Sequence, residues 1–329
     1  MSVIKKKLLA DFESNHILMV HPHMHRDKSH YSDLYKIFSS LNKIFLNNKT
    51  KQTIVFNENG KFENLYNLTD PSVSKIFYNC DDIWIRDYFP KIYISDGSKK
   101  IIRYKFNAYG EKYDYKNDNN FREIFNYVSD EIDLDDFVLE GGNLEFSARG
   151  ILITNIHCIK KNNIANYTIN VEEEINRMIE KLGVSELFTI NLDGIIGDDT
   201  NGHIDNLIRF IDNETIVYFA SKDESYCNYQ LACKLARQVK DIVDRSKIIK
   251  RAIPLYHTKD DELIKNGKIY PYSKLNFIAT TECFIFPCIS NNRESLQHDL
   301  DGLPSKTKIY VINTEAALIE YGGLHCLTA

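Results

Sequence analysis

The segment ILITNIHCIKKNNIANYTINVEEEINRMIEKL, residues 151–182, contains the two kinds of element from which we predict the fold to be built. It opens on a short apolar run with strand character, Ile151–Asn155. It closes on Val171–Leu182, where apolar residues at 171, 175, 178, 179 and 182 recur at the spacing of one buried helix face. The segment therefore predicts a strand followed by an amphipathic helix.

The same alternation of short strands and longer helices extends along the chain. We predict further strands at His16–Val20, Thr53–Phe56, Ile101–Tyr104, Thr215–Phe219, Leu275–Ala279, Phe284–Ile289 and Lys308–Ile312. We predict further helices at Ser32–Leu46, Asn120–Ile132, Asn228–Arg245 and Asn292–Leu300. Five helices embedded among strands divide the chain into five units of comparable size, and no Ser/Gly-rich or Pro-rich linker interrupts them. We therefore expect one α/β domain over residues 1–329.

The bulk composition disfavours several classes of function. The net charge is −5, from 41 basic and 46 acidic residues, whereas sequence-independent nucleic-acid binding needs a basic surface. No run approaches the roughly 20 apolar residues of a membrane span, and the N-terminal residues lack the apolar core of a signal peptide. We expect a cytoplasmic protein that binds neither nucleic acid nor membrane, and homo-oligomer formation stays open.

The seven cysteines predict reduced thiols rather than disulfides or a zinc site. Their number is odd, and no pair has zinc-finger or C-x-x-C spacing. Most lie in apolar surroundings typical of inert core residues, whereas Cys326 follows glycines and a histidine near the C-terminus. Four histidines, at positions 21, 23, 25 and 30, are close in sequence, but no acidic or cysteine partner completes a metal site nearby. We expect these histidines at a rim or in a loop.

Four polar segments stand out from their apolar surroundings. They are DDIWIRDYFP (81–90), LEGGN (139–143), GDDTNGHIDN (197–206) and YGGLHC (321–326). Each segment alone is weak evidence for a functional site, because tight turns and structural ion pairs produce similar patterns. Together they supply a coherent chemistry, because a reactive cysteine needs a histidine, and the histidine needs an acidic group to orient it. The remaining carboxylates, Asp87 and Asp205, suit a planar cation, since a guanidinium can donate paired N–H bonds to each.

These segments resemble the agmatine deiminase family, also called bacterial-type peptidylarginine deiminases, of the pentein superfamily. The family motifs W-x-R-D, E-G-G, acidic-T-N-G-H-x-D and G-x-[IL]-H-C are matched in order by residues 84–87, 140–142, 199–205 and 322–326. The resemblance covers almost the whole chain from about residue 81 onward. It implies a five-bladed α/β propeller with pseudo-fivefold repeats, which agrees with the five predicted units.

The resemblance also implies a role for each matched residue. Cys326 would attack the guanidinium carbon, and His203, oriented by Glu140, would protonate the departing ammonia and then deprotonate the hydrolytic water. Asp87 and Asp205 would hold the guanidinium nitrogens. Trp84 would line the pocket, and Asp199 would contribute to binding the distal amine of the substrate. With Asp87 and Asp205, these two residues make up the expected substrate contacts. The implied reaction converts agmatine to N-carbamoylputrescine and ammonia, a step toward putrescine and the polyamines, and needs no metal or organic cofactor.

Some positions depart from the family pattern. Tyr88 and Phe89 replace a small residue and a glycine, Tyr321 and Gly323 flank Gly322, and His21-Pro22 replaces a Trp-Pro dipeptide. None of these is a proposed catalytic residue, so substrate identity is less constrained than reaction type. The alternatives are deimination of free arginine or of a C-terminal peptidyl arginine, an amidinotransferase, and a non-catalytic binding module on the same fold.

Overall fold

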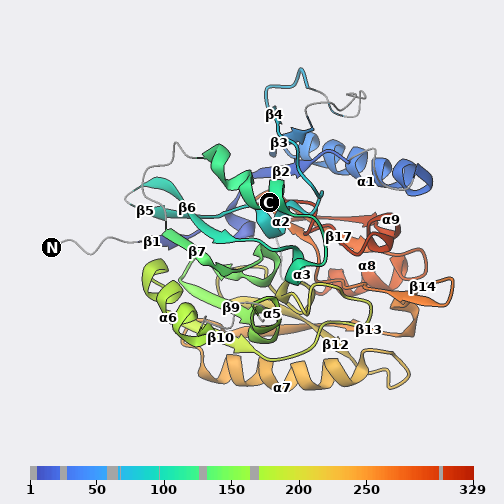
Figure 1. Cartoon of the computed structure of the whole chain (residues 1–329). Helices are drawn as coiled ribbons and strands as arrows, with labels where there is room; N and C mark the ends of the chain where they lie inside the picture. The colour runs from blue at the N-terminus through green and yellow to red at the C-terminus, as the bar shows by residue number, and fades with distance from the viewer. Residues whose placement is uncertain are drawn as a thin grey trace.

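The strands of the molecule form several small sheets rather than one continuous sheet (Figure 1). The computed structural model describes residues 6–22, 28–57, 66, 68–95, 97–125, 132–163, 170–303 and 307–329. Within these residues, five sheets have three or four strands, and one further sheet is a two-stranded hairpin. The chain is therefore α/β, as predicted.

The five larger sheets are formed one after another along the chain, except that β1, which precedes the first sheet in sequence, belongs to the second sheet. The first contains β2 (His16–Val20), β3 (Lys51–Phe56) and β4 (Val73–Phe77), and the second contains β1 (Lys6–Leu8), β5 (Lys91–Ser95), β6 (Ser98–Lys105) and β7 (Ile132–Val138). The third contains β8 (Glu145–Ser147), β9 (Ile151–Asn155) and β10 (Glu186–Ile190), and the fourth contains β11 (Ile208–Phe210), β12 (Thr215–Ser221) and β13 (Arg251–His257). The fifth contains β16 (Ile278–Ala279), β17 (Cys283–Cys288) and β18 (Lys308–Asn313), and the hairpin is β14 (Leu263–Lys265) with β15 (Lys268–Tyr270).

Each larger sheet contains a parallel pair of strands joined by a helical crossover. The pairs are β2 with β3, β6 with β7, β9 with β10, β12 with β13, and β17 with β18. Parallel neighbours need such a crossover, because a tight hairpin can join only antiparallel strands. The crossovers contain α1 (Lys28–Asn47); α3 (Ala108–Glu111), α4 (Lys116–Asn120) and the 3-10 turn η2 (Phe121–Phe125); α5 (Ile156–Asn162) and α6 (Val171–Leu182); α7 (Tyr229–Arg245); and α8 (Arg293–Asp301).

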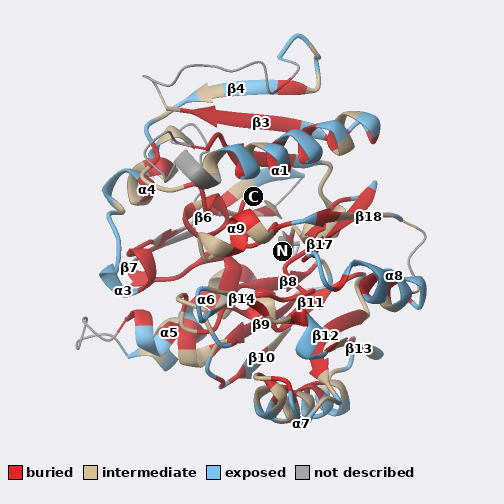
Figure 2. Ribbon diagram, turned by 90° about the vertical axis from the view of Figure 1, so that its right-hand side faces the viewer, coloured by how far each residue is buried: buried red, intermediate tan, exposed pale blue. Residues whose placement is uncertain are grey.

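The long helices bury one face against the sheets and expose the other (Figure 2). Helix α7 packs Leu235, Val239 and Ile242 into the same apolar cluster as strand β12. Helix α6 begins at the side-chain cap of Asn170 and ends at Gly183, whose φ of 65° is readily adopted by glycine. Burial of these amphipathic faces explains why the 3.6-residue pattern could be recognised in the sequence.

Most of the long predicted elements are confirmed. The bounds of α6 and of strands β2 and β9 agree with the prediction, and α1, α7 and α8 differ from it by a few residues at their ends. None of the helices in the described part of the chain combines the length and apolar character that a membrane span requires.

Two predicted elements are wrong in part. The helix expected over Asn120–Ile132 is the end of α4 followed by η2; residues 126–131 lie outside the described residues, and β7 begins at Ile132. The alternation of apolar and acidic residues in IDLDDFV, residues 132–138, is a strand pattern that the helix prediction overran. The strand expected over Leu275–Ala279 is reduced to β16, and the residues before it form a buried loop.

Candidate active site

Three of the four polar segments lie in connections between one sheet and the next, and the fourth follows the last sheet. Asp87 is in the short helix α2 (Ile85–Tyr88) before β5, and Glu140 begins the 3-10 turn η3 (Gly141–Asn143) before β8. His203 begins the turn η4 (Ile204–Asn206), which contains Asp205 and precedes β11. Cys326 follows the last helix, α9 (Glu315–Ile319), at the end of the chain. Residues far apart in sequence are thus carried by short turns and helices that follow different sheets.

His203 lies between two carboxylates. Its Nε2 donates to Oε2 of Glu140 at 2.8 Å, and its Nδ1 lies 3.5 Å from Oδ1 of Asp87. All three side chains are almost completely buried. The structure therefore places His203 in contact with Glu140, the acidic residue that the sequence prediction pairs with it.

Gly142 marks the point on which three of these groups converge. A Cβ atom added there would lie 2.6 Å from Nδ1 of His203, 2.7 Å from Oδ1 of Asp87 and 3.0 Å from Oδ2 of Asp205. These separations are too short for any side chain, so glycine is required by the close approach of the groups around it. The amide of Gly142 also donates to Oδ1 of Asp87 at 2.8 Å, which fixes that carboxylate.

The thiol of Cys326 lies beside the second guanidinium-binding candidate. Its Sγ is 4.0 Å from Oδ2 of Asp205 and 3.5 Å from Nδ2 of Asn276. Asn276 also accepts the backbone N–H of His325 through Oδ1 at 2.9 Å. Asn276 could not be recognised from the sequence as a site residue, because it lies in an apolar run, Leu275–Ala279, that predicts a strand.

His325, which precedes the candidate nucleophile, connects Asp205 to the N-terminal region. Its Nδ1 lies 2.7 Å from Oδ2 of Asp205, and its Nε2 lies 2.7 Å from Oδ2 of Asp11. Asp11 also binds Arg86 at 3.1 Å and Arg209 at 3.1 Å. Sequence reasoning assigned His325 no role and overlooked Asp11, because nothing in the sequence indicates which distant groups a single aspartate will meet.

Hydrogen bonds link five segments in a closed order, namely residues 81–90, 139–143 and 197–206, then the segment that contains Asn276, and last the Cys326 segment. Gly142 contacts Asp87, and His203 contacts Glu140. The third and fourth segments are joined by the side chains of Asn206 and Asn276, and Asn276 contacts the Cys326 segment. The circle closes where the N–H of Arg86 donates to the carbonyl of Cys326 at 3.3 Å. Each segment is therefore positioned by its two neighbours.

The buried charges shift the pKa values of the site in different directions. Burial and the nearby carboxylates of Asp205 and Glu140 raise the pKa of Asp87 to about 6, against the opposing effect of His203. Burial disfavours the imidazolium of His203, but the carboxylate of Asp87 and its other neighbours keep its pKa well above the usual value. Burial raises the pKa of Asp205, but the hydrogen bond to His325 and the nearby groups His325, His203 and Arg209 together lower it more, so the net shift is downward.

The same surroundings keep Cys326 protonated. Burial raises the pKa of its thiol far above the usual value, and the carboxylates of Asp205 and Asp87 raise it further. Three buried polar atoms, Oε1 of Glu140, Nδ1 of His203 and Oδ1 of Asp205, have no hydrogen-bond partner among the described residues. Buried polar atoms usually have partners, so their concentration here indicates a place where a polar ligand binds.

The two remaining predicted contacts lie around this centre. The ring of Trp84 covers Gly322, where an added Cβ would lie 2.2 Å from Cζ3. Asp199 is half-buried, and its Oδ2 accepts the hydroxyl of Tyr113 at 2.8 Å while its carbonyl accepts Lys112. Burial, together with the neighbouring carboxylate of Asp198, raises the pKa of Asp199 to about 6.

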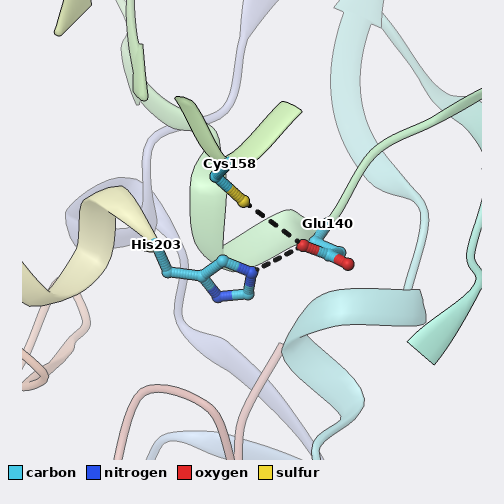
Figure 3. Close-up of side chains that lie close together, drawn as sticks. All are labelled: Glu140, Cys158 and His203. Carbon is cyan, nitrogen blue, oxygen red and sulfur yellow. Dashed lines mark hydrogen bonds and ion pairs between the residues drawn. The ribbon is translucent and has the colours of Figure 1, made fainter. Parts of the chain in front are cut away.

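A second cysteine, Cys158, joins the histidine and its acidic partner (Figure 3). Its Sγ lies 3.5 Å from Oε2 of Glu140, and the ligand atoms of Glu140, Cys158 and His203 are close enough together to hold a metal ion. Oε2 of Glu140 already accepts His203 and, at 2.6 Å, Nδ2 of Asn162. Because these donors saturate that oxygen, we interpret the group as a hydrogen-bonded support for His203. Burial and the charge of Glu140 raise the pKa of Cys158 to about 12, which keeps the thiol available as a donor.

The departures from the family pattern lie mostly in packed regions. Tyr88 donates to the carbonyl of Asp82 at 2.8 Å, and its ring packs against Phe106 and Phe121. His21 is buried, with its ring 5.2 Å from that of Phe56. The histidines at positions 23 and 25 lie outside the described residues, as does the side chain of the one at position 30.

The chain is similar to known proteins over most of its length. A sequence model of the Porphyromonas-type peptidyl-arginine deiminase family matches residues 8–329. A Mycoplasma capricolum protein named "Putative agmatine deiminase" is 28% identical over 292 residues, which cover 82% of this chain and 79% of that protein. An Enterococcus faecalis protein of the same name is 24% identical over 293 residues, covering 82% of this chain and 80% of that protein.

Solved structures share the fold over nearly the full length. A crystal structure described as a "putative peptidyl-arginine deiminase" is 26% identical, with a TM-score of 0.85 and coverage of 100% of this chain and 98% of that chain. A cysteine-to-serine variant of the C. jejuni agmatine deiminase, solved with substrate bound, is 22% identical, with a TM-score of 0.85 and coverage of 100% and 97%.

Proposed function

The chain belongs to the Porphyromonas-type peptidyl-arginine deiminase family, and we propose that it is an agmatine deiminase, a hydrolase of guanidine carbon–nitrogen bonds. The observation that carries this proposal is the convergence of Asp87, His203 and Asp205 around Gly142, with the thiol of Cys326 4.0 Å from Asp205. Two buried carboxylates on either side of one position suit a planar cation, because a guanidinium can donate two parallel N–H bonds to each.

In the first step, the bound cation changes the charge state of the thiol. Without substrate, the carboxylates of Asp87 and Asp205 oppose the thiolate of Cys326. A guanidinium placed between these carboxylates offsets their charge and attracts the thiolate directly, so the thiol releases its proton to solvent. Substrate binding and activation of the nucleophile are therefore coupled, which protects the thiol when the site is empty.

The chemistry then proceeds through a covalent intermediate. The thiolate of Cys326 bonds to the guanidinium carbon, and one nitrogen leaves as ammonia with a proton from His203, which leaves a thiouronium on the sulfur. His203 next removes a proton from water, whose oxygen bonds to the same carbon. The carbon–sulfur bond then breaks, and the second proton of the water passes to the sulfur, which restores the thiol. The products are the ureido compound, N-carbamoylputrescine from agmatine, and ammonia. The raised pKa of His203 suits its first task, because it begins the cycle as an acid.

The choice of agmatine over arginine rests on charge. Arginine and C-terminal peptidyl arginine carry a carboxylate that needs a cationic or hydrogen-bonding partner. Arg86 is the only arginine or lysine in the four polar segments, and it is bound to Asp11 at 3.1 Å. Asp199 instead offers a carboxylate at the rim for the distal amine of agmatine. Trp84, over Gly322, would line the pocket beside the apolar stem.

We further propose that the five sheets are blades of one catalytic domain, a five-bladed α/β propeller over residues 1–329. The five parallel crossovers and the closed order of hydrogen bonds among the connecting segments support this arrangement. We propose a cytoplasmic location and a role in polyamine biosynthesis through putrescine, and a homo-oligomer is compatible with both.

The test is a substrate panel with a nucleophile variant. Purified protein is incubated with agmatine, free arginine, a C-terminal arginyl peptide and simple alkylguanidines, and ureido product and ammonia are measured. We expect turnover of agmatine that Cys326→Ala abolishes. Preference for another guanidine would replace agmatine as the substrate while retaining the mechanism. Transfer of the amidino group to an added amine, in place of hydrolysis that releases ammonia, would indicate an amidinotransferase. No turnover of any guanidine would indicate a binding module.

A further inference from the structure

Four consecutive residues after β6 have a left-handed backbone. Their φ values are 47° at Ala108, 62° at Tyr109, 90° at Gly110 and 66° at Glu111. Glycine adopts this conformation readily, but the other three are sterically disfavoured in it. Such residues persist where surrounding contacts enforce them, and they gather at functional sites. The short element α3 is therefore a left-handed turn whose conformation needs an explanation.

The turn is held by contacts that also reach the active site. Oδ1 of Asn107 accepts the N–H of Gly110 at 3.0 Å, and Nδ2 of Asn107 donates to the carbonyl of Asn162 at 2.9 Å. The side chain of Asn162 donates to Glu140 at 2.6 Å. The turn and the acidic partner of His203 thus share one anchor, Asn162.

The turn places Tyr109 against the other carboxylate beside His203. Tyr109 is buried, and its hydroxyl donates to Oδ2 of Asp87 at 2.9 Å. Oδ1 of Asp87 accepts the N–H of Gly142 at 2.8 Å, so each carboxylate oxygen has one donor from the protein. The Tyr109 ring lies 5.8 Å from the imidazole of His203. The orientation of Asp87 is therefore set from both sides.

We propose that Tyr109 is a positioning residue for guanidinium recognition, held in the left-handed turn so that its hydroxyl fixes the Asp87 carboxylate that receives the cation. The inference rests on the proposed function, because it takes Asp87 as a guanidinium-binding residue. Without the hydroxyl, one oxygen of Asp87 loses its protein donor, and the carboxylate can rotate away from the orientation that paired N–H bonds require.

The hydroxyl also affects the charge of Asp87. The ionisable groups around this carboxylate are His203, Glu140, Asp205, Cys326, Tyr104 and Tyr109 itself. Burial, with Asp205 and Glu140, raises the pKa of Asp87 to about 6. A hydrogen bond to the ionised form favours that form, so removing the Tyr109 hydroxyl raises this pKa further. Asp87 is then neutral over a wider acidic range, and cation binding weakens as the pH falls.

The first experiment measures kcat and KM for agmatine as a function of pH in Tyr109→Phe. We expect KM to rise about tenfold near neutral pH, with kcat reduced less than about threefold, because one interaction made in both ground and transition states is lost. We also expect the acid limb of kcat/KM to move to higher pH. An unchanged KM together with an unmoved acid limb would overturn the proposal. Tyr272→Phe is the matched control, since its buried hydroxyl donates to the carbonyl of Pro287.

A pair of backbone variants tests the role of the turn. Gly110→Ala adds a methyl group whose nearest neighbour is Oδ1 of Asn162 at 3.7 Å, so its effect comes from the strained φ rather than from crowding. We expect it to raise KM in the same way as Tyr109→Phe. Glu111→Gly keeps the left-handed φ without a side chain, and we expect it to retain the wild-type KM. Thermal unfolding of each variant shows whether a raised KM comes from a displaced turn or from an unfolded protein. A folded Gly110→Ala variant with the wild-type KM would contradict the proposal that the turn holds Tyr109 in place.

Binding in the absence of turnover separates this inference from the proposed function. Agmatine is titrated calorimetrically into Cys326→Ala with and without Tyr109→Phe. About tenfold weaker binding in the double variant supports the inference even if the wild-type protein turns over no guanidine. Equal binding in both proteins overturns the inference alone. No binding of agmatine or guanidinium to either protein overturns both.

Discussion

Cys326 combines a buried thiol with two carboxylate neighbours. Burial raises its pKa, and Asp205 and Asp87 raise it further, so the resting residue is a thiol. Reactive cysteines more often lie beside positive charge, which lowers the thiol pKa. At this site the charge of His203 lowers the thiol pKa but does not outweigh burial and the two carboxylates, so the thiol gains a further positive neighbour only when a cation occupies the space between the carboxylates. The reactivity of a single residue therefore reports on whether that space is filled.

Alkylation of Cys326 should depend on a bound cation. In the free protein at neutral pH, we expect iodoacetamide to modify this residue more slowly than an exposed cysteine. A low concentration of guanidinium, which binds without an apolar stem, should accelerate the modification about tenfold or more, since each unit of pKa lowering gives ten times more thiolate. Modification is followed by mass spectrometry of the C-terminal peptide. Equal rates with guanidinium and with tetramethylammonium would contradict the coupling.

At the scale of elements, the 3-10 turn η3 gathers three side chains from two other segments, residues 81–90 and 197–206. An added Cβ at Gly142 would lie within 3.0 Å of atoms of His203, Asp87 and Asp205. The E-G-G motif is therefore explained by close packing around its second glycine, as well as by the role of Glu140. The turn η3 therefore sets the separation between the carboxylates of Asp87 and Asp205.

Gly142→Ala should inactivate the protein without unfolding it. The methyl group would push His203 or Asp87 out of position, and a displacement of about 1 Å can cost about a hundredfold in rate. We expect kcat/KM to fall at least about a hundredfold. Gly302→Ala is the matched control, since the nearest atom to its added methyl, the carbonyl oxygen of Asp299, is at an ordinary 3.5 Å. Wild-type activity in folded Gly142→Ala would show that the groups do not converge there.

Elements with a strong local pattern could be predicted from the sequence, and elements defined by distant contacts could not. Helix α6 has its own cap at each end and an apolar face, so its bounds follow from local residues. The turn of Ala108–Glu111 has no such pattern, because its left-handed conformation depends on Asn162 and Asn201 from other segments. Tyr109, Asn276 and Asp11 were missed for the same reason, whereas the residues in the four motifs could be found because their neighbours in sequence are also unusual.

At the scale of the whole molecule, Asp11 joins the two ends of the chain. It lies in the N-terminal turn η1 (Asp11–Glu13) and accepts hydrogen bonds from Arg86, Arg209 and His325. Arg209 is fully buried and also binds Glu145 at 3.0 Å. Burial disfavours the Asp11 carboxylate, but Arg86 and the other partners hold its pKa well below the usual value. The carboxylate is thus ionised at neutral pH, and its contribution to stability is lost only as the pH falls through that lowered pKa.

Replacing Asp11 should therefore affect stability and catalysis together. Asp11→Ala leaves two buried arginines without a shared partner, and we expect a loss of about 3 kcal/mol in unfolding free energy. His325 also loses the contact that orients it toward Asp205, so kcat/KM should fall even at temperatures where the variant is fully folded. Asp11→Asn retains hydrogen-bonding atoms, so its unfolding free energy and its kcat/KM should lie between those of the wild-type protein and those of Asp11→Ala. Asp244→Ala, which removes an exposed partner of Lys240, is the control and should change little. If folded Asp11→Ala kept wild-type kcat/KM, the N-terminal turn would stabilise the fold without positioning Asp205 and Cys326.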